Sequence, residues 1–225
     1  MARTVGIDLG GTKLLALALD DDGLVTGERL VRSPEGADAV IDAFVSVVNA
    51  QRADGHIDAV GVGAAGLVDR DGVLYMAPNL PGLRHVPIKA LLQERLQLPV
   101  QVDNDATCAA WGERELGAAK GSDDVVIVTL GTGIGGGLVY DGHLYRGANG
   151  FAGEVGHVKV DPDTIVVGGG LLVAADLFLD RARELFTDLV LAGDVRPGVA
   201  IVPAVLGEKA GAIGAALVAR DLLSK

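Results

Sequence analysis

Short apolar runs alternate with amphipathic stretches along the whole chain. Residues 4–8 and 14–19 are apolar or β-compatible and enclose a glycine-rich stretch, which predicts two strands joined by a glycine turn. Over 36–54, apolar residues recur at the three- and four-residue spacing of an amphipathic helix. The pattern then predicts a buried strand over 58–69, a helix over 87–97, a strand over 98–105 and a helix over 106–117.

The second half of the chain continues this alternation. Residues 125–145 again have the order strand, glycine turn, strand and turn. The pattern after them predicts strands over 154–160, 163–168 and 198–207, and helices over 174–190 and 208–222. Strands that alternate with helices in this way indicate an α/β fold.

The two glycine-turn hairpins resemble each other. When the first is shifted by 121 positions, four residues coincide: Leu9 with Leu130, Gly10 with Gly131, Leu17 with Leu138 and Asp20 with Asp141. Four identities can arise by chance, but the shared order of elements is a stronger signal. We interpret it as a duplication, with two related halves that each open with a β-hairpin whose turn is rich in backbone N–H groups.

Charge and composition narrow the class of protein. With 225 residues, 49% of them hydrophobic, the chain can bury the core of one large domain or two small ones. A formal charge of -11 argues against nucleic acid as the main partner, because phosphate binding needs clustered Lys and Arg. The single Cys108 excludes a disulfide framework and a multi-cysteine metal site, and we interpret it as a small core residue. Without an apolar signal core, or an unbroken apolar window of about 18 residues, we expect a cytoplasmic protein with no membrane partner.

Two glycine turns are candidates for phosphate binding, because glycine lets the backbone approach a phosphate closely. In "GIDLGGTK" the carboxylate Asp8 ends a strand and precedes the turn at 10–12, for which an ordinary hairpin turn is the alternative. "LGTGIGGG" matches G-x-G-x-x-G, but a strand rather than a helix follows, so we reject a nicotinamide-dinucleotide site and keep phosphate. "VVGGGL" is a third glycine turn, which could pass the base or ribose of a nucleotide and is equally compatible with a plain strand-to-helix turn. The chain has no G-x-x-x-x-G-K-[ST] motif.

Six motifs in one order carry a resemblance to a known family. "IDLGGTK", "APNL", "VDNDA", "LGTGIGGG", "GEVGH" and "VVGGGL" resemble the ROK family of sugar kinases, and most closely its bacterial glucokinases. The resemblance implies the actin-like ATPase (ribonuclease H-like) fold, with two duplicated α/β domains and ATP in the cleft between them. We therefore expect an N-terminal domain over 1–117, a C-terminal domain over 118–207 that is truncated near 162, and a C-terminal helix over 208–225 that packs back on the first domain.

The resemblance also implies roles for the residues that follow the strand over 98–105. It makes Asp105 the general base that takes a proton from a sugar hydroxyl, while Asn104 binds a sugar hydroxyl. Asp103 stands where the family often has glutamate, and we give it no catalytic role. For Asp105 a helix N-cap is the alternative role, and one carboxylate could serve as both. The other sugar contacts implied are Asn79, Glu154 and His157.

On the nucleotide side, the resemblance implies ATP with Mg²⁺, which Asp8 would hold directly or through water. The implied contacts to the nucleotide are Asp8, Gly10, Gly11, Thr12, Lys13, Gly131, Thr132, Gly133, Gly168, Gly169 and Gly170.

One part of the family pattern is missing. In ROK kinases a zinc motif of one histidine and three cysteines follows "GEVGH", and then a helical segment; here "GEVGHVKVDP" runs straight into "DTIVVGGGL". Zinc is therefore not expected, and His157 could bind it only if a cysteine segment exists that the sequence omits. The three residues 161–163 span at most about 10 Å, which is too short for a parallel crossover. We predict a discontinuity or a departure from the family topology at 161–164, with the strand over 164–167 retained and 158–160 as its weaker partner. An engineered deletion, a natural deletion and an incomplete sequence all remain open as explanations.

The function expected from these features is an ATP-dependent hexose kinase, specifically a glucokinase that forms glucose 6-phosphate with Mg²⁺. The alternative is a nucleotide-binding module whose sugar phosphorylation is impaired by the missing segment. The family's transcriptional regulators resemble fusions with an N-terminal helix-turn-helix, and a phosphate hairpin that begins by residue 4 gives no reason to expect one here. The sequence leaves open which hexose or N-acetyl sugar is used, whether polyphosphate replaces ATP, and whether the chain forms a homodimer.

Overall fold

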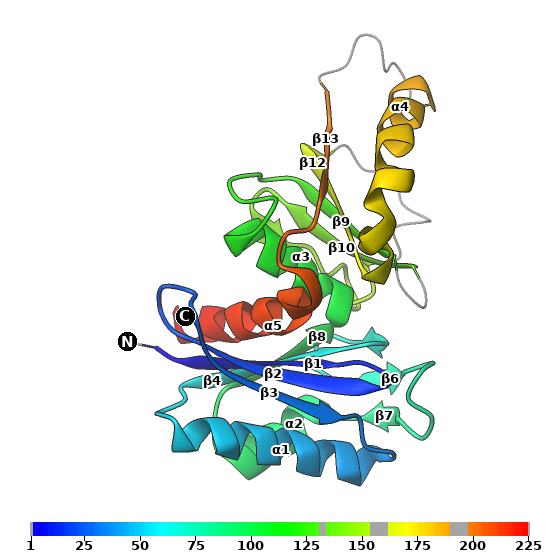
Figure 1. Cartoon of the computed structure of the whole chain (residues 1–225). Coiled ribbons are helices and arrows are strands. Elements are labelled where there is room, and N and C mark those ends of the chain that lie inside the picture. Colours follow the sequence, from blue (N-terminus) through cyan, green and yellow to red (C-terminus); the bar gives the residue numbers. More distant parts are fainter. Residues whose placement is uncertain (1, 131–133, 154–161, 190–197, 225) are drawn as a thin grey trace.

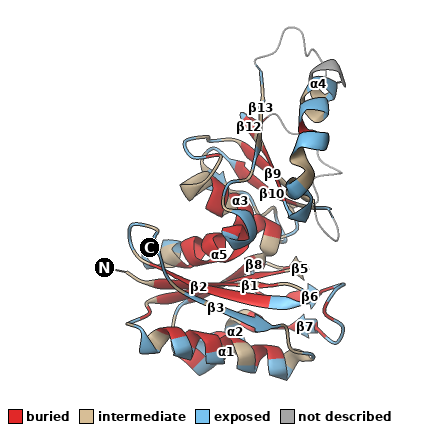
Figure 2. Ribbon diagram, in the orientation of Figure 1, coloured by how far each residue is buried: buried red, intermediate tan, exposed pale blue. Residues whose placement is uncertain are grey.

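The chain folds around two five-stranded sheets, one from each half of the sequence (Figure 1). The computed structural model describes residues 2–130, 134–153, 162–189 and 198–224. Buried residues concentrate on the two sheets and on the helices packed against them (Figure 2).

The first sheet has the order β3-β2-β1-β4-β8. Its strands β1, β2 and β3 form an antiparallel meander, whereas β1, β4 and β8 run parallel. The bounds are β1 (Thr4–Leu9), β2 (Lys13–Leu19), β3 (Val25–Arg32), β4 (Ala59–Ala64) and β8 (Val100–Asn104).

The second sheet repeats this arrangement with the order β11-β10-β9-β12-β13. Here β9, β10 and β11 are antiparallel, and β9, β12 and β13 are parallel. The bounds are β9 (Val125–Leu130), β10 (Ile134–Tyr140), β11 (His143–Leu144), β12 (Thr164–Gly168) and β13 (Ala200–Pro203). The predicted α/β class and the duplicated arrangement of the two halves are therefore confirmed.

The shift of 121 positions needs one correction. It holds for β1 and β9, because Asp8 pairs with Gly63 of the parallel neighbour and Thr129 pairs with Gly168 in the same way. In the antiparallel partner the shift falls to 120, since Gly6 lies opposite Leu17 while Ile127 lies opposite Gly137. The second hairpin encloses one residue fewer, so the coincidence of Leu17 with Leu138 is not a structural equivalence.

Helices α1 (Ala37–Ala53) and α2 (Ile88–Leu96) cover the outer face of the first sheet, and α3 (Asp105–Leu116) and α5 (Ala210–Asp221) lie between the two sheets (Figure 1). Helix α4 (Leu179–Leu189) lies beside the second sheet. The remaining elements are a small sheet of β5 (Leu67–Val68), β6 (Leu74–Met76) and β7 (Arg84–Val86), and the 3₁₀ helices η2 (Gly170–Leu177), η3 (Gly207–Lys209) and η4 (Leu222–Ser224).

Two glycines let α5 lie close to its neighbours. A Cβ on Gly61 of β4 would lie 1.7 Å from the Ala215 carbonyl oxygen, and a Cβ on Gly214 would lie 1.6 Å from the carbonyl oxygen of Cys108. Backbone atoms cannot swing aside as the end of a long side chain can, so neither site accepts a larger residue without moving the helix. Helix α5 is consequently fixed against both β4 and α3.

Several elements differ from the predicted ones. The helix predicted over 174–190 begins only at Leu179, and the residues before it form the 3₁₀ helix η2. The strand predicted over 164–167 is confirmed as part of β12, which pairs in parallel with β9 and β13. The strand predicted over 154–160, with its partner segment 158–160, lies outside the described residues, and so does residue 161 of the predicted discontinuity. The pattern did not indicate β3, β6 or β7.

Candidate active site

A cleft of about 450 Å³ opens between the two halves, at the carboxyl ends of the parallel strands. The first hairpin turn, the strands β9 and β10 of the second hairpin and the first turn of α3 border it, so the duplicated hairpins face the same space. The lining includes Gly10, Gly11, Gly66, Met76, Asn79, Asn104, Asp105, Thr129, Gly135, Gly136, Gly150, Phe151, Gly153 and Gly169.

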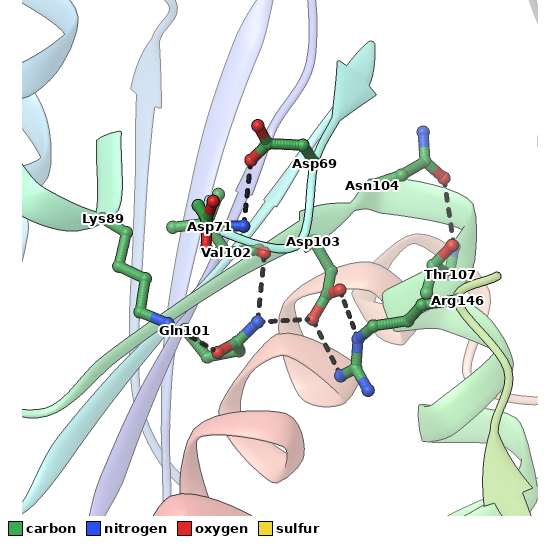
Figure 3. A network of polar contacts seen from close by, with 9 residues as sticks. All are labelled: Asp69, Asp71, Lys89, Gln101, Val102, Asp103, Asn104, Thr107 and Arg146. Atoms are coloured by element: carbon green, nitrogen blue, oxygen red, sulfur yellow. Dashed lines mark hydrogen bonds and ion pairs between the residues drawn. The ribbon is translucent and has the colours of Figure 1, made fainter. Parts of the chain in front are cut away.

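The amide of Asn104 caps helix α3. Its Oδ1 accepts a hydrogen bond of 3.1 Å from the Thr107 backbone N–H (Figure 3). Its Nδ2 donates one of 3.1 Å to the Gly66 carbonyl. The N-cap is therefore Asn104, and the alternative that Asp105 caps this helix is wrong. The Oδ1 of Asn104 keeps one lone pair for a ligand, because it accepts a single hydrogen bond here.

Asp105 begins α3 and contributes its carboxylate to the cleft. Its Oδ1 accepts a hydrogen bond of 2.9 Å from the Ala106 backbone N–H. Burial raises the pKa of Asp105, against hydrogen bonds from the Ala106 and Asp105 backbones and the Asn104 side chain that lower it. A carboxylate with a raised pKa is a better proton acceptor than a free one, provided that it is ionised at the working pH.

Asp8 is the last residue but one of β1 and lies close to Asp105. Burial, and then the charge of Asp105, raise the pKa of Asp8 to about 7, and the ammonium of Lys13 acts in the opposite direction. Two neighbouring carboxylates repel each other when both are ionised, and a bound cation would stabilise the ionised forms. Among the described residues no group of three or more His, Cys, Asp or Glu side chains could hold a metal ion. This arrangement fits Mg²⁺, which usually binds through one or two carboxylates together with substrate phosphates and water.

Backbone hydrogen bonds fix the first glycine turn, which is a predicted phosphate contact. The Gly10 N–H donates to the Lys13 carbonyl at 3.0 Å, and the Thr12 carbonyl accepts a bond of 3.1 Å from the Ser33 N–H. Gly11 lies against Asn79, so that a Cβ on this glycine would lie 2.9 Å from the Asn79 Cβ. The structure thus brings Asn79, a predicted sugar contact, next to the predicted phosphate turn. The Lys13 ammonium forms an ion pair with the Glu208 carboxylate.

The second half contributes its own glycine turns. Gly169 lines the cleft with φ of 91°, and a Cβ there would lie 2.3 Å from the Leu130 carbonyl oxygen. Gly168 ends β12 in pairing with Thr129, and Gly170 begins η2. The predicted contacts Gly131, Thr132, Gly133, Glu154 and His157 lie outside the described residues.

Three cleft or near-cleft residues were missed from the sequence. Thr129 occupies in β9 the position that Asp8 has in β1, so the shift of 121 could have identified it. Phe151 also lines the cleft. Its ring lies edge-on to that of Tyr75, with 6.1 Å between the ring centroids. Arg146 binds Asp103, the residue to which the sequence gave no role. For these last two, the sequence held no periodic or motif signal.

Comparison with known proteins agrees with this geometry. A model of the ROK family matches residues 4–164 and, separately, 158–222. The two matches meet at 158–164, where the sequence lacks the family's zinc-motif and helical segment.

Curated relatives and solved structures are similar along most of the chain. The glucokinase of Streptomyces coelicolor is 43% identical over 171 residues, covering 76% of this chain and 54% of that protein. An N-acetylmannosamine kinase of Escherichia coli is 37% identical over 171 residues, covering 74% of this chain and 57% of that protein. The chain thus spans about half the length of the curated relatives it matches.

The structure of a ROK family glucokinase from Streptomyces griseus, in complex with glucose and AMPPNP, aligns with a TM-score of 0.86 at 29% identity and covers 98% of this chain and 100% of that chain. This similarity and the two matching sheets confirm the expected actin-like ATPase fold. Among the described residues, no helix is both long and apolar enough to cross a membrane.

Proposed function

The chain belongs to the ROK family, and from this membership we propose that it is an ATP-dependent hexose kinase that phosphorylates glucose. The observation that carries the proposal is the position of Asp105. It stands at the first turn of α3, in a cleft that glycines of both halves also line. A proton acceptor and glycines that let a phosphate approach the backbone, together in one cleft, are what phosphoryl transfer to a hydroxyl requires.

In the proposed reaction, the hexose lies against Asn79, Asn104 and the N-terminal first turn of α3. Asp105 accepts the proton of the 6-hydroxyl as the sugar oxygen attacks the γ-phosphorus, and ADP leaves. Glu154 and His157 remain proposed sugar contacts on the strength of the family motif alone. Because Asn104 is fixed by its bonds to Thr107 and Gly66, the amide is oriented before the sugar arrives.

The nucleotide phosphates are proposed to lie along the glycine turns at 10–13 and 131–133, and the base or ribose along the turn at 168–170. Asp8 is the proposed ligand of Mg²⁺, directly or through water, and Mg²⁺ supplies charge neutralisation on the transferring phosphoryl group. Lys13 would exchange its ion pair with Glu208 for a phosphate, at small cost because both side chains are exposed.

The choice of glucose rests on the relatives. The Streptomyces coelicolor protein is a glucokinase, and the Streptomyces griseus structure holds glucose with an ATP analogue. The Escherichia coli relative acts on N-acetylmannosamine, so an N-acetyl sugar is the competing substrate. Polyphosphate is the competing donor. We also propose a cytoplasmic role in carbohydrate metabolism, without nucleic-acid or membrane partners. The proposed domain division is 1–117, 118–207 and the helix 208–225.

A coupled assay tests the proposal. Glucose, mannose, fructose, N-acetylglucosamine and N-acetylmannosamine are each supplied with ATP·Mg²⁺ or with polyphosphate, and ADP release or sugar phosphate is measured. We expect the highest kcat/KM with glucose and ATP, and no turnover without Mg²⁺. Absence of sugar phosphate from every pair would refute the proposal.

A second candidate function is a nucleotide-binding module with impaired sugar phosphorylation. It is favoured by the two family-model matches that meet at 158–164, because the family's helical segment at that point contributes to the sugar side of the cleft. Calorimetry separates the two candidates. ATP binding without hexose turnover would favour the module.

A further inference from the structure

Asp103 and Arg146 form a two-pronged ion pair beside the cleft (Figure 3). The Arg146 Nε donates to Asp103 Oδ1 at 2.6 Å, and its Nη2 donates to Oδ2 at 3.0 Å. The Asp103 side chain is only 7% exposed and that of Arg146 26%. Two parallel bonds from a planar guanidinium fix orientation as well as distance, which a single contact between exposed side chains does not.

Further polar groups hold Asp103 in place. The Gln101 Nε2 lies 3.4 Å from Asp103 Oδ2, and Lys89 of α2 donates to Gln101 Oε1 at 3.3 Å (Figure 3). Burial lowers the pKa of Arg146, but the hydrogen bond and charge of Asp103 outweigh it, so the net shift is upward and Arg146 stays charged. Arg146 therefore carries the charge that the pair requires.

The pair joins two segments that border the cleft. Asp103 is the last residue before Asn104 and Asp105, which cap and begin α3. Arg146 opens the 146–153 segment, where its carbonyl accepts a bond of 3.2 Å from the Ala152 N–H. That segment supplies Gly150, Phe151 and Gly153 to the cleft lining.

The rest of the 146–153 segment contacts other elements. A Cβ on Gly150 would lie 2.7 Å from the Val68 carbonyl oxygen, and the Phe151 ring packs edge-on against that of Tyr75. A Cβ on Gly153 would lie 2.3 Å from the Gly136 carbonyl oxygen, so the far end of the segment lies against β10. The near end is tied to the first half through Arg146. A displaced guanidinium would shift the wall carrying Phe151 relative to the Asn104 and Asp105 side chains.

We propose that Asp103 and Arg146 are positioning residues, whose ion pair aligns the 146–153 wall with Asn104 and Asp105 so that one sugar contacts both. This assignment rests on the proposed hexose kinase function. Neither residue touches the reacting atoms, and their effect is transmitted through the backbone on either side of the pair.

Steady-state kinetics of Arg146→Met test the assignment. We expect kcat/KM for the hexose to fall about 10²-fold through both kcat and KM, as for a misplacement of about 1 Å, while KM for ATP is unchanged. Arg146→Lys should recover little of the lost kcat/KM, because an ammonium cannot form the two parallel hydrogen bonds that the guanidinium makes to Asp103. The control is Arg95→Met, which removes an ion pair of 2.6 Å with Asp42 on the outer helices and should keep the parent kinetics. Parent kinetics in Arg146→Met would overturn the assignment.

A double variant separates positioning from stability. Replacing both partners of a buried ion pair by apolar residues is often neutral or stabilising, whereas removing one leaves an unpaired charge. Asp103→Leu with Arg146→Met should therefore melt close to the parent chain and yet stay defective in hexose turnover. Recovery of turnover together with stability would mean that the pair is only structural, and the proposal would fail.

Hydrogen exchange gives a readout that needs no activity. In Arg146→Met the Thr107 amide, which donates to Asn104, should exchange faster, while amides of α1 keep the parent rate. A uniform increase over the chain, or none, would overturn the proposal. If the parent chain phosphorylates no hexose, the proposed function fails, and this experiment still decides whether the pair aligns the two segments.

Discussion

At the scale of single residues, Asp103 and Asp105 show how position assigns different tasks to one side chain. Asp103 lies within β8 and is paired with an arginine, whereas Asp105 begins α3 and borders the cleft without an ion-pair partner among the described residues. Burial without a counter-charge raises the pKa of Asp105. A proton acceptor has to be free of such a partner, so Asp105 is the better candidate for the base.

The first prediction concerns Asp105. Asp105→Asn should lower kcat by about 10²–10⁴-fold, because the amide cannot accept the hydroxyl proton. ATP affinity, measured by calorimetry, should stay that of the parent, and Asp42→Asn on the surface serves as the control. Turnover close to the parent value would show that another group is the base.

The second prediction concerns the pH dependence of stability at Asp8. Its pKa in the folded chain is about 7, above the ordinary value of 3.8, so the folded state holds the proton more tightly. The stabilisation is complete below the ordinary pKa and is lost as the pH rises through about 7. The asparagine in Asp8→Asn cannot ionise, so the variant does not lose this stabilisation. Its free energy of unfolding should therefore rise relative to that of the parent chain between about pH 5 and pH 8.

Urea unfolding at both pH values measures this difference. One pKa unit corresponds to about 1.4 kcal/mol, so the gain should exceed about 1 kcal/mol. ATP·Mg²⁺ should stabilise the parent more than Asp8→Asn, since the variant lacks the proposed metal ligand. A constant difference between the two proteins from low to high pH would contradict the raised pKa.

The sequence predicted the candidate site at this scale only where a motif carried it. "VDNDA" placed Asn104 and Asp105 at a strand end before a helix, and both lie there. The division of labour between them was not predictable, because an N-cap is settled by the backbone angles and by which donor, here the Thr107 N–H, comes within reach. The partner of Asp103 is 43 residues away in sequence, and no local pattern encodes such a contact.

At the scale of elements, glycine determines how closely the layers approach. Helix α5 is buried over almost its whole length, and its residues are mostly small. The sequence predicted a small-residue helix here, and the glycines of β1 and β4 give it a surface on which to lie. Strand β3 was not predicted because most of its residues are exposed and its burial does not alternate regularly. In η2, an apolar sequence forms 3₁₀ turns with no buried residue.

The third prediction tests the contact between α5 and α3. Gly214→Ala adds a Cβ that would lie 1.6 Å from the Cys108 carbonyl oxygen, so the helices must separate. Alanine is the better helix former by about 1 kcal/mol, but we expect a net loss of about 3 kcal/mol or more in the free energy of unfolding. Gly198→Ala is the control, since a Cβ there meets nothing within 4 Å. An unchanged melting temperature for Gly214→Ala would contradict this packing.

At the scale of the whole molecule, α5 connects the halves. It follows the second sheet in sequence but packs on the first, alongside α3. Two ion pairs, Lys13 with Glu208 and Glu28 with Lys209, also cross between the first sheet and the turn before α5. All four side chains are exposed, so these pairs contribute little, and the buried face of α5 supplies most of the connection. The halves can therefore exchange surface pairs during ligand binding without losing their main contact.

The fourth prediction concerns the proposed nucleotide side and the proposed sugar side of the cleft, because only the sugar side adjoins the lacking segment. The proposed nucleotide contacts Gly10, Gly11 and Gly169 directly follow strands of the two sheets, or lie one residue further on. The proposed sugar contacts Glu154 and His157 instead adjoin the place where the family's helical segment is lacking. We therefore expect an ATP affinity similar to that of the Streptomyces coelicolor glucokinase, but a higher KM for glucose, because binding loses contacts that only the lacking segment provides.

Calorimetry with ATP·Mg²⁺ and steady-state kinetics over a wide glucose range, on both proteins under the same conditions, measure the two quantities. Intact mass is determined first, because a value well above 22.9 kDa would mean that the chain carries residues beyond its recorded sequence, which could complete the sugar side. At a mass of 22.9 kDa, equal glucose KM values would show that 225 residues suffice for the whole sugar site. A raised KM with retained ATP affinity would instead locate the cost of the lacking segment on the sugar side alone, where the two family-model matches meet.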